Sequence, residues 1–332
     1  MSNSIKILYM TDVHFRGTNP RARTDNYLEA VKEKLIEVFN IAHEEGCQQI
    51  VCGGDLFDRP DTSFAVTREF VELIKRFPFD NRILTIPGNH EIYGYSLETL
   101  PRTVLGLLEL GYLKILNRTP FTISNYDNDF AVSITGQGFY YDIDRNPNDY
   151  MVSITTSPFP LDEKTYHVHV IHSMLVDKPL PYDVPHTVVK NVKTNADVIL
   201  SGHEHIGYGV IKREDGVIFC NPGALGRVSA RVEEMLRPVQ VAILTFTEEG
   251  ITTELVPLKS ARPGNEVLSR EHIEQASAAK TRANEFLELL TAEGEMNAMN
   301  IPDMLNLICS REKIPDDVRN EALKRLGEKR PA

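Results

Sequence analysis

Apolar and polar positions follow two alternating patterns over the first 220 residues. Short apolar runs predict strands over seven segments: Ile5–Met10, Gln49–Cys52, Ile83–Ile86, Phe130–Ile134, Val168–Ile171, Val198–Leu200 and Val217–Phe219. Between them, apolar residues at three- and four-residue spacing predict helices over Asn26–Glu45, Val66–Phe77 and Thr99–Glu109. The segment 117–164 is richer in turn residues and predicts short strands joined by long turns. This alternation is typical of an α/β or layered α-β-β-α protein.

The pattern changes toward the C-terminus. Val239–Phe246 and Ile251–Val256 predict a β-hairpin with Gly250 at the turn. The composition then shifts to Ala, Glu, Leu, Lys and Met, with a proline at each of two apparent helix starts. We therefore predict a main domain over residues 1–258 and a small helical appendage over residues 259–332.

Composition narrows the class of protein. Hydrophobic residues make up 42% and charged residues 25%, as in ordinary globular proteins, and no apolar run approaches the ~20 residues that cross a bilayer. The N-terminus lacks the charged segment and cleavage site of a secretory signal, so we expect a cytoplasmic location and no membrane partner. The four cysteines form no C-x-x-C pair. The net charge of −11 argues against bulk electrostatic coating of nucleic acid.

Polar residues of metal-binding type follow the early strands. Asp12 and His14 follow Ile5–Met10, and residues two apart in an extended segment project to the same side, so both can reach one ion. Asp55 follows two glycines, which permit a sharp exit from the strand and a close backbone approach to an ion. Each motif has an ordinary alternative, because Asp-x-His occurs by chance and Asp55 is also suited to capping a turn.

Amide and imidazole side chains follow the later strands. Asn89 offers a neutral oxygen, and His90 beside it can donate a proton without being a ligand. His172 follows one strand, and His203 and His205 follow the next. A set of oxygen and imidazole ligands without thiolate suits Mn²⁺, our first choice, or Fe²⁺ or Zn²⁺, and fits Ca²⁺ poorly. Because chance is a poor account of so many such residues at consecutive strand ends, we predict a site for two divalent metal ions.

The motifs resemble those of the calcineurin-like metallophosphoesterase superfamily. Its pattern is Asp-x-His, Gly-Asp-x-x-Asp-Arg, Gly-Asn-His-Asp/Glu, a lone His and Gly-His-x-His, and all five blocks occur in order over residues 12–205. The resemblance implies an α/β fold, a two-sheet β-sandwich flanked by helices, with residues 1–258 as the catalytic domain. It also implies two ligand sets that share one carboxylate: Asp12, His14, Asp55 and His205 for one metal, and Asp55, Asn89, His172 and His203 for the other.

A narrower resemblance concerns residues 5–95. The spacing from His14 to Asp55, the Arg-rich loop 16–25 and the sequence Gly-Asp-Leu-Phe-Asp are similar to the SbcD-type nuclease subunit of DNA double-strand-break repair complexes. That resemblance implies DNA as a substrate and an SbcC-like ABC-type ATPase with a long coiled coil as a partner, bound through the C-terminal helices. Packing or oligomerisation, including a homodimer, is the alternative role for these helices.

Further residues are candidates for catalysis and substrate binding. The leaving oxygen of a phosphate ester needs a proton, and His90 is the candidate donor because it neighbours a ligand yet has no ligand role in the pattern. Asp58 is the candidate for orienting His90, its alternative being a helix N-cap ahead of Pro60. Four arginines on loops that leave the metal motifs either contact the substrate backbone or belong to solvated loops: Arg16, Arg21, Arg23 and Arg59.

Three functional hypotheses follow. The leading one is a metal-dependent DNA exonuclease or endonuclease that works in an SbcCD-like repair or recombination complex. The alternative is a phosphodiesterase or phosphatase of the same superfamily that acts on a small molecule or a phosphoprotein. The excess of acidic residues favours the alternative, whereas the Arg-rich loop and the helical tail favour the nuclease. A third hypothesis, a non-catalytic scaffold, is opposed by the retention of every ligand and of His90.

Overall fold

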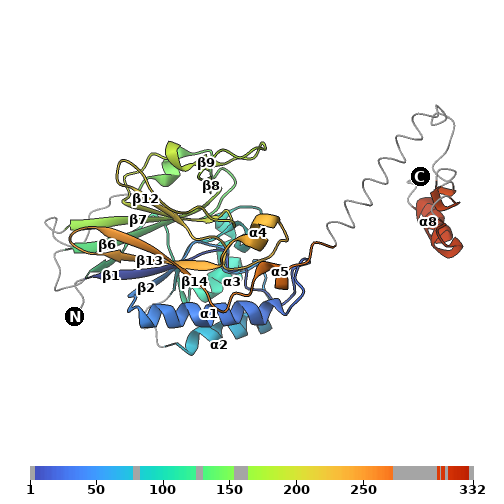
Figure 1. Cartoon of the computed structure of the whole chain (residues 1–332), viewed down its shortest axis with the longest axis horizontal. Coiled ribbons are helices and arrows are strands. Elements are labelled where there is room, and N and C mark those ends of the chain that lie inside the picture. Colours follow the sequence, from blue (N-terminus) through green and yellow to red (C-terminus); the bar gives the residue numbers. More distant parts are fainter. Residues whose placement is uncertain are drawn as a thin grey trace. The chain divides into compact units, whose positions relative to one another are not determined.

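Two six-stranded mixed sheets carry the fold (Figure 1). The strands of the first sheet are β1 (Ile5–Met10), β2 (Gln49–Cys52), β3 (Ile83–Thr85), β4 (Leu113–Ile115), β13 (Gln240–Phe246) and β14 (Ile251–Pro257). Their order across the sheet is β14-β13-β1-β2-β3-β4. Strands β1 to β4 run parallel, and β13 is antiparallel to both β1 and β14. The carboxyl ends of β1, β2 and β3 therefore meet at one edge of the sandwich.

The second sheet also has four parallel strands among its six. Its strands are β5 (Phe121–Ser124), β6 (Phe130–Gln137), β7 (Lys164–Ser173), β10 (Val198–His203), β11 (Gly209–Lys212) and β12 (Ile218–Asn221). Their order is β11-β12-β10-β7-β6-β5, with β6, β7, β10 and β12 parallel. A separate two-stranded pair is formed by β8 (Leu175–Val176) and β9 (Thr187–Val188).

The alternation of side chains along β1 divides the core into layers. Ile5, Ile7 and Tyr9 belong to the core cluster that fills the space between the two sheets. Leu8 and Met10 point to the opposite face, into the cluster that the helices cover. Both faces of this strand are buried, which explains why its sequence is a continuous apolar run.

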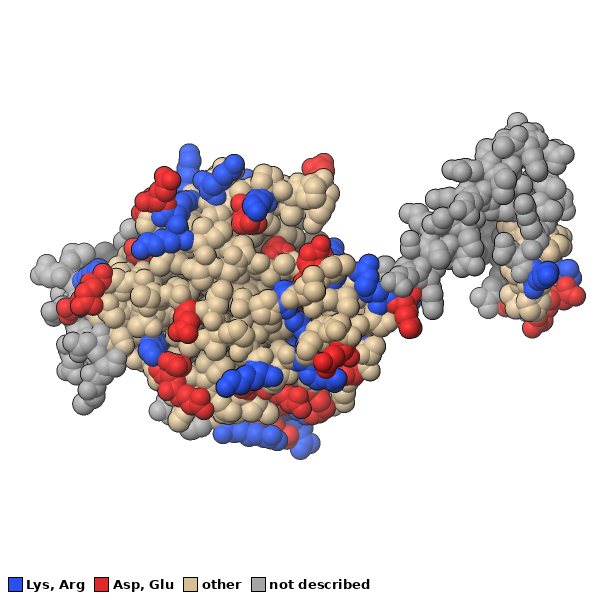
Figure 2. Space-filling view, viewed as in Figure 1, with Lys and Arg blue, Asp and Glu red and all other residues tan. Residues whose placement is uncertain are grey.

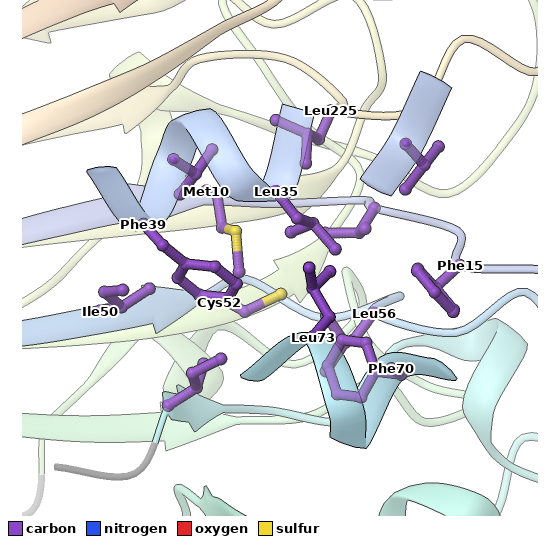
Figure 3. Close-up of a cluster of buried hydrophobic side chains, with 14 of the residues drawn as sticks. Met10, Phe15, Leu35, Phe39, Ile50, Cys52, Leu56, Phe70, Leu73 and Leu225 are labelled. Carbon is purple, nitrogen blue, oxygen red and sulfur yellow. The ribbon is translucent and has the colours of Figure 1, made fainter. Parts of the chain in front are cut away.

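Helices cover the outer face of the first sheet (Figures 1 and 3). These are α1 (Tyr27–Glu44), α2 (Phe64–Lys75) and the short α3 (Val104–Leu108). Asn26 caps α1 and Ser63 caps α2, each by accepting a hydrogen bond from a backbone N–H of the first turn. Figure 3 shows Leu35 and Phe39 of α1 and Phe70 and Leu73 of α2 meeting the side chains of the sheet.

The predicted helix Thr99–Glu109 differs from what the structure contains. The segment begins as the 3₁₀ helix η2 (Leu97–Arg102), and α3 starts only at Val104. Pro101 lies inside η2, and because proline has no N–H and clashes with the preceding turn, it prevents one continuous α-helix.

A third cluster of apolar residues covers the outer face of the second sheet. It joins Ile171 of β7, Ile199 of β10 and Phe219 of β12 to residues of the 3₁₀ helices η3 (Pro147–Tyr150) and η4 (Val189–Asn191). The whole is a two-sheet α/β sandwich, as the sequence predicted.

The structure is a computed structural model, and it describes residues 4–77, 83–124, 130–152, 164–271, 305–306, 308–310 and 313–328. The chain divides into two compact units, Met1–Ser269 and Arg270–Ala332. The first unit continues past residue 258 because Val267 and Leu268 are buried against Ala22. The short helices α4 (Val232–Leu236) and α5 (Gly264–Val267) also belong to it.

Much of the predicted helical appendage lies outside the described residues. In the second unit α8 (Asp316–Glu328) is described, and it begins directly after Pro315, where a helix start was expected. None of the helices in the described part of the chain is long and apolar enough to span a membrane.

His169 of β7 is an internal structural residue. Its ring is fully buried; Nε2–H donates to the carbonyl of Asp149 at 2.8 Å, and Nδ1 accepts from Thr135 Oγ1 at 2.8 Å. Burial lowers the pKa of His169 to about 4, although the hydrogen bond to Asp149 opposes this. The ring is therefore neutral in the folded protein.

This neutral imidazole predicts a specific loss of stability in acid. The unfolded chain protonates His169 near pH 6.5 but the folded chain only near pH 4, so the free energy of unfolding falls as pH decreases through this window. Between pH 7.5 and pH 5, urea unfolding in EDTA should show wild type losing about 2 kcal/mol more than His169→Gln, since each pKa unit corresponds to about 1.4 kcal/mol. Equal losses in the two proteins would contradict the assignment.

Candidate metal centre

The sandwich brings the predicted ligands together at one edge. They come from both sheets, at the ends of β1, β2, β3, β7 and β10: Asp12, His14, Asp55, Asn89, His172, His203 and His205. The ligand atoms of Asp12, His14 and His205 form one group within 4.8 Å of one another, and those of Asp55, His172 and His203 form a second. The seventh predicted ligand, Asn89, joins the second group, because its Oδ1 lies 3.2 Å from His172 Nε2.

Short distances link the two groups. His205 Nε2 lies 3.5 Å from Asp12 Oδ1, and His172 Nε2 lies 3.4 Å from Asp55 Oδ2. Asp55 Oδ2 is also 3.9 Å from His14 Nε2, so this oxygen faces both groups. The position is the one that a bridging carboxylate requires.

The two carboxylates are buried among imidazoles. Asp12 and Asp55 are 0% and 1% exposed. Burial raises the pKa of each, but the surrounding histidines, His205 for Asp12 and His172 for Asp55, outweigh it and hold both pKa values below their usual range. In turn, Asp55 overcomes the effect of burial on His172 and raises its pKa to about 9. The carboxylates are ionised and require compensating positive charge.

The donor set fits divalent cations. Nε2 of His14 and Nε2 of His205 face each other at 3.1 Å, and the buried Asp55 Oδ2 accepts no well-aligned hydrogen bond from the described residues. His172 Nδ1–H donates to the carbonyl of Gly53 at 2.8 Å, so Nε2 is the nitrogen that faces the centre. Imidazole nitrogens and carboxylate oxygens that converge in this way are the donors that a divalent metal ion would bind.

The backbone at the ligands is strained. Asp12, His14, Asp55 and His203 have φ values of 51°, 49°, 49° and 83°, in the left-handed region that non-glycine residues rarely adopt. Each such residue costs on the order of 1 kcal/mol, and such strain clusters at functional sites. Hydrogen bonds from two backbone N–H groups hold it in place. At the edge of the first sheet His14 N donates to Asp55 O at 2.9 Å, and between the two sheets His203 N donates to the Asp12 carboxylate at 3.1 Å.

Two glycines permit the close approach of these loops. A Cβ on Gly88 would lie 2.0 Å from Asp55 Oδ1, and one on Gly54 would lie 2.5 Å from His172 Nδ1. Gly54 also has a φ of 98°, which other residues avoid. Any side chain at either position would displace a candidate ligand.

Glu91 is a positioning residue that sequence reasoning missed. It is fully buried; Oε1 accepts a hydrogen bond from Phe57 N and Oε2 one from Gly88 N, both at 3.0 Å. Burial and the nearby Asp55 raise its pKa to about 8. Glu91 therefore ties the loop that carries Asp55 to the loop that carries Asn89. Its place in the Gly-Asn-His-Glu motif was the available signal.

His90 lies at the exposed side of the centre. Its backbone N donates to Asp55 Oδ1 at 2.9 Å, and its ring lies 4.8 Å from the ring of His14. A ring nitrogen of His90 comes within 4.8 Å of ligand atoms of His14 and Asp55. His90 is thus the exposed imidazole next to the ligand groups.

Asp58 contacts His90 differently from what we expected. The backbone carbonyl of Asp58 accepts a hydrogen bond from His90 Nδ1 at 3.1 Å. The carboxylate instead lies 3.5 Å from His14 Nδ1 and 2.9 Å from Arg16. The side chain of Asp58 therefore faces the candidate ligand His14, and its main-chain carbonyl holds His90.

The sequence profile of the calcineurin-like phosphoesterase family matches residues 5–207. The chain belongs to this family. Members use a dimetal centre, and the two ligand groups described above occupy the matched region.

Individual relatives of this phosphoesterase are distant. The double-strand break repair protein MRE11 of Encephalitozoon cuniculi is 23% identical over 299 residues, which covers 78% of this chain and 48% of that protein. The chain thus spans about half the length of this relative. Among solved structures, a dimetal phosphatase from Danio rerio is 12% identical, covers 76% of this chain and 96% of that chain, and has a TM-score of 0.47. A calcineurin-like phosphoesterase from Bacillus subtilis is 14% identical, with coverages of 85% and 97% and a TM-score of 0.44.

The four candidate arginines of the phosphoesterase differ in position. Arg16 reaches the centre through its ion pair with Asp58, and Arg21 and Arg59 are exposed. Arg23 is buried, and its guanidinium forms two hydrogen bonds with Asp25, at 2.7 and 2.8 Å. Its surroundings indicate a structural role for Arg23, in place of the substrate contact we expected.

Removing Glu91 from the phosphoesterase should weaken both the fold and the centre. Glu91→Ala leaves two buried backbone N–H groups without acceptors, and we expect a loss of about 3 kcal/mol in urea unfolding, since each orphaned group costs about 1–3 kcal/mol. Metal content after dialysis should fall as well, because the loops carrying Asp55 and Asn89 lose their link. Glu91→Gln keeps one acceptor and should lose roughly half as much stability. A Glu91→Ala protein with wild-type stability would refute the positioning role.

Proposed function

We propose that this phosphoesterase is a two-metal-dependent phosphodiesterase that cleaves DNA. The observation that carries the proposal is the geometry at the edge of the sandwich. There the carboxylate of Asp55 faces both candidate ligand groups, and the exposed imidazole of His90 lies beside them. The distant similarity to a double-strand break repair protein supports DNA as the substrate class.

Two ligand sets would hold the metals. Asp12, His14 and His205 would hold one and Asn89, His172 and His203 the other, with Asp55 shared between them. Bound there, two divalent cations would neutralise the charge of a phosphate diester and lower the pKa of a bound water. We expect Mn²⁺ first, with Fe²⁺ or Zn²⁺ as alternatives, because the set combines carboxylate, amide and imidazole without thiolate.

His90 would protonate the leaving oxygen. Nδ1–H is engaged by the carbonyl of Asp58, so Nε2 is the atom that would carry and deliver the proton. The hydrogen bond from its backbone N to Asp55 fixes the distance between this imidazole and the shared carboxylate. Arg16, held by Asp58 at the same side, would contact the substrate backbone.

An aromatic surface beside the second ligand group supports a nucleic-acid substrate. The ring of Phe139 lies 5.3 Å from that of His203, and the ring of Tyr95 lies 5.4 Å from that of Phe139. Tyr95 is 49% exposed and has a φ of 56°, so a strained backbone presents this ring to solvent. Exposed aromatic rings stack on unpaired bases, which a simple alkyl phosphate ester lacks.

The small-molecule alternative rests on charge. The chain carries 47 acidic and 36 basic residues, and on the face shown in Figure 2 the blue and red side chains are interspersed. A duplex-binding surface normally concentrates basic residues. A phosphodiesterase for a small phosphate ester needs no such surface, so this alternative is tested alongside DNA.

The second unit is our candidate for binding a partner. We propose that it binds an SbcC-like coiled-coil ATPase, with a homodimer as the alternative. Val318 of α8 is 54% exposed, and a large apolar side chain on a helix surface suits contact with a partner helix. Sedimentation of the chain alone and with the ATPase distinguishes the two, and Val318→Glu should weaken whichever complex forms.

Two substitutions separate metal binding from proton transfer. Asp55→Asn should remove the metal pair and the activity together, as measured by metal analysis and ester hydrolysis. His90→Gln should keep its metal content and lower turnover by about 10² to 10⁴-fold, the usual contribution of a general acid. Metal loss in the His90 variant would instead make this residue a ligand, as its proximity to His14 and Asp55 allows.

The substrate class is decided by parallel assays with Mn²⁺. We expect cleavage of linear DNA and of bis-p-nitrophenyl phosphate. Tyr95→Ala should lower DNA cleavage about 10-fold more than ester hydrolysis, because stacking contributes about 1–3 kcal/mol per base. Tyr182→Ala is the matched control, since Tyr182 is also exposed, at 53%. Cleavage of the ester alone would favour the small-molecule alternative, and cleavage of neither would refute catalysis.

A further inference from the structure

A cluster of buried cations lies on the helix side of the first sheet. Arg23, Lys34, Arg227 and Arg237 are 8%, 3%, 4% and 7% exposed, although such side chains are rarely buried without partners. The first three line a cavity of about 240 Å³ next to the N-terminal half of α1. None of the residues that line this cavity is a candidate metal ligand.

The nearby carboxylates pair with only two of the four basic side chains in this cluster. Asp25 binds the guanidinium of Arg23 through both oxygens, and Glu234 does the same for Arg237 at 2.7 and 3.0 Å. The remaining two cations are Lys34 and Arg227, and no carboxylate among the described residues forms an ion pair with either. The cluster therefore holds two more basic side chains than carboxylates that pair with it.

Among the described residues, Lys34 and Arg227 form hydrogen bonds only with neutral groups. Lys34 Nζ donates to the carbonyl of Leu225 at 2.7 Å, which uses one of its three N–H bonds. Arg227 donates to the carbonyls of Arg262 and Arg237, and its buried Nε has no hydrogen-bond partner in the described part of the chain. Two buried cations with unused donors, beside a cavity, are what an anion site provides.

The electrostatics agree with an uncompensated charge. Burial, together with the neighbouring Arg23, Arg227 and Arg237, lowers the pKa of Lys34 to about 7. The other acidic residues at the cavity, Glu29 and Glu33, are exposed, and Glu29 pairs with Lys32. The buried wall of the cavity is thus basic, and the carboxylates that do not pair with the cluster lie at its solvent side.

We propose that this cavity binds a small phosphate-type oxyanion, with Lys34 and Arg227 supplying the charge that holds it. The ligand chemistry is shared by inorganic phosphate and the phosphate group of a monoester. A tetrahedral anion in the cavity would accept hydrogen bonds from the unused N–H groups of Lys34. Its negative charge would compensate the positive charges of Lys34 and Arg227. The site is separate from the metal centre, although Leu225 connects them by donating its backbone N–H to Thr11, the neighbour of Asp12.

The test uses metal-free full-length protein in EDTA, so that phosphate cannot bind through the metals. Isothermal titration with inorganic phosphate should show one site per chain, and phosphate should raise Tm in a saturable way, since a ligand that binds only the folded state stabilises it. Sodium chloride at matched ionic strength controls for screening. Asp55→Asn should bind phosphate as wild type does.

Lys34→Met tests the assignment, and Lys32→Met is the matched control. Lys32 lies on the same helix but forms surface ion pairs with Glu29 and Glu69. We expect Kd for phosphate to rise at least about 10-fold in Lys34→Met and to stay within about 2-fold in Lys32→Met. If Lys34→Met does not fold, the wild-type titration decides, and the absence of one-site binding in EDTA overturns the proposal.

Two other results would overturn it. One is a Tm increase no larger with phosphate than with chloride; the other is equal phosphate affinity in Lys34→Met and wild type. A parallel titration with glycerol phosphate identifies the source of the ligand. Tighter binding of the monoester points to a phosphorylated metabolite, and tighter binding of inorganic phosphate points to the free ion.

Discussion

The burial of Asp12 and Asp55 is the constraint on which the rest of the site depends. Two ionised carboxylates next to a hydrophobic sandwich are costly unless positive charge compensates them. The chain meets this need by placing histidines from both sheets around them and by leaving one oxygen of Asp55 open toward both ligand groups. The left-handed backbone of the ligands, the close contacts at Gly54 and Gly88 and the buried Glu91 all serve to hold these carboxylates in one arrangement.

Much of the fold was readable from the sequence because its central strands are buried on both faces. β1 and β2 have the predicted bounds, and α1 differs from its predicted bounds by one residue at each end. β7 and β10 contain the predicted segments but are longer, because β7 begins at Lys164 and β10 continues to His203. The strands β4, β8, β9 and β11 were missed, and β5 lies in the segment 117–164, for which short strands were predicted without bounds. The sequences of β4 and β5 do alternate between apolar and polar residues, but β4 has only three residues, and β8 and β9 have two each, so these runs are too short for their pattern to mark a strand.

The candidate site, like the fold, could be predicted from the sequence only in part. The ligand types and their order are local features of short motifs, so the sequence could predict which residues gather at the sheet edge. Their surroundings depend on contacts between distant segments and could not be read from it. The direction of the Asp58 carboxylate, toward His14, is one example, and the burial of Arg23 against Asp25 is another. Glu91 is a third, because its partners Phe57 and Gly88 belong to two different loops.

The position of β1 has a consequence for how the chain is made. β1 leaves the ribosome long before its antiparallel neighbour β13, since Ile5 pairs with Phe246. Until β13 has been synthesised, one edge of β1 has no partner in the finished sheet order. Open strand edges template aggregation, and long-range pairings form slowly. The nascent chain is therefore most vulnerable over the interval between these two strands, and chaperones that shield an apolar edge would act on it there.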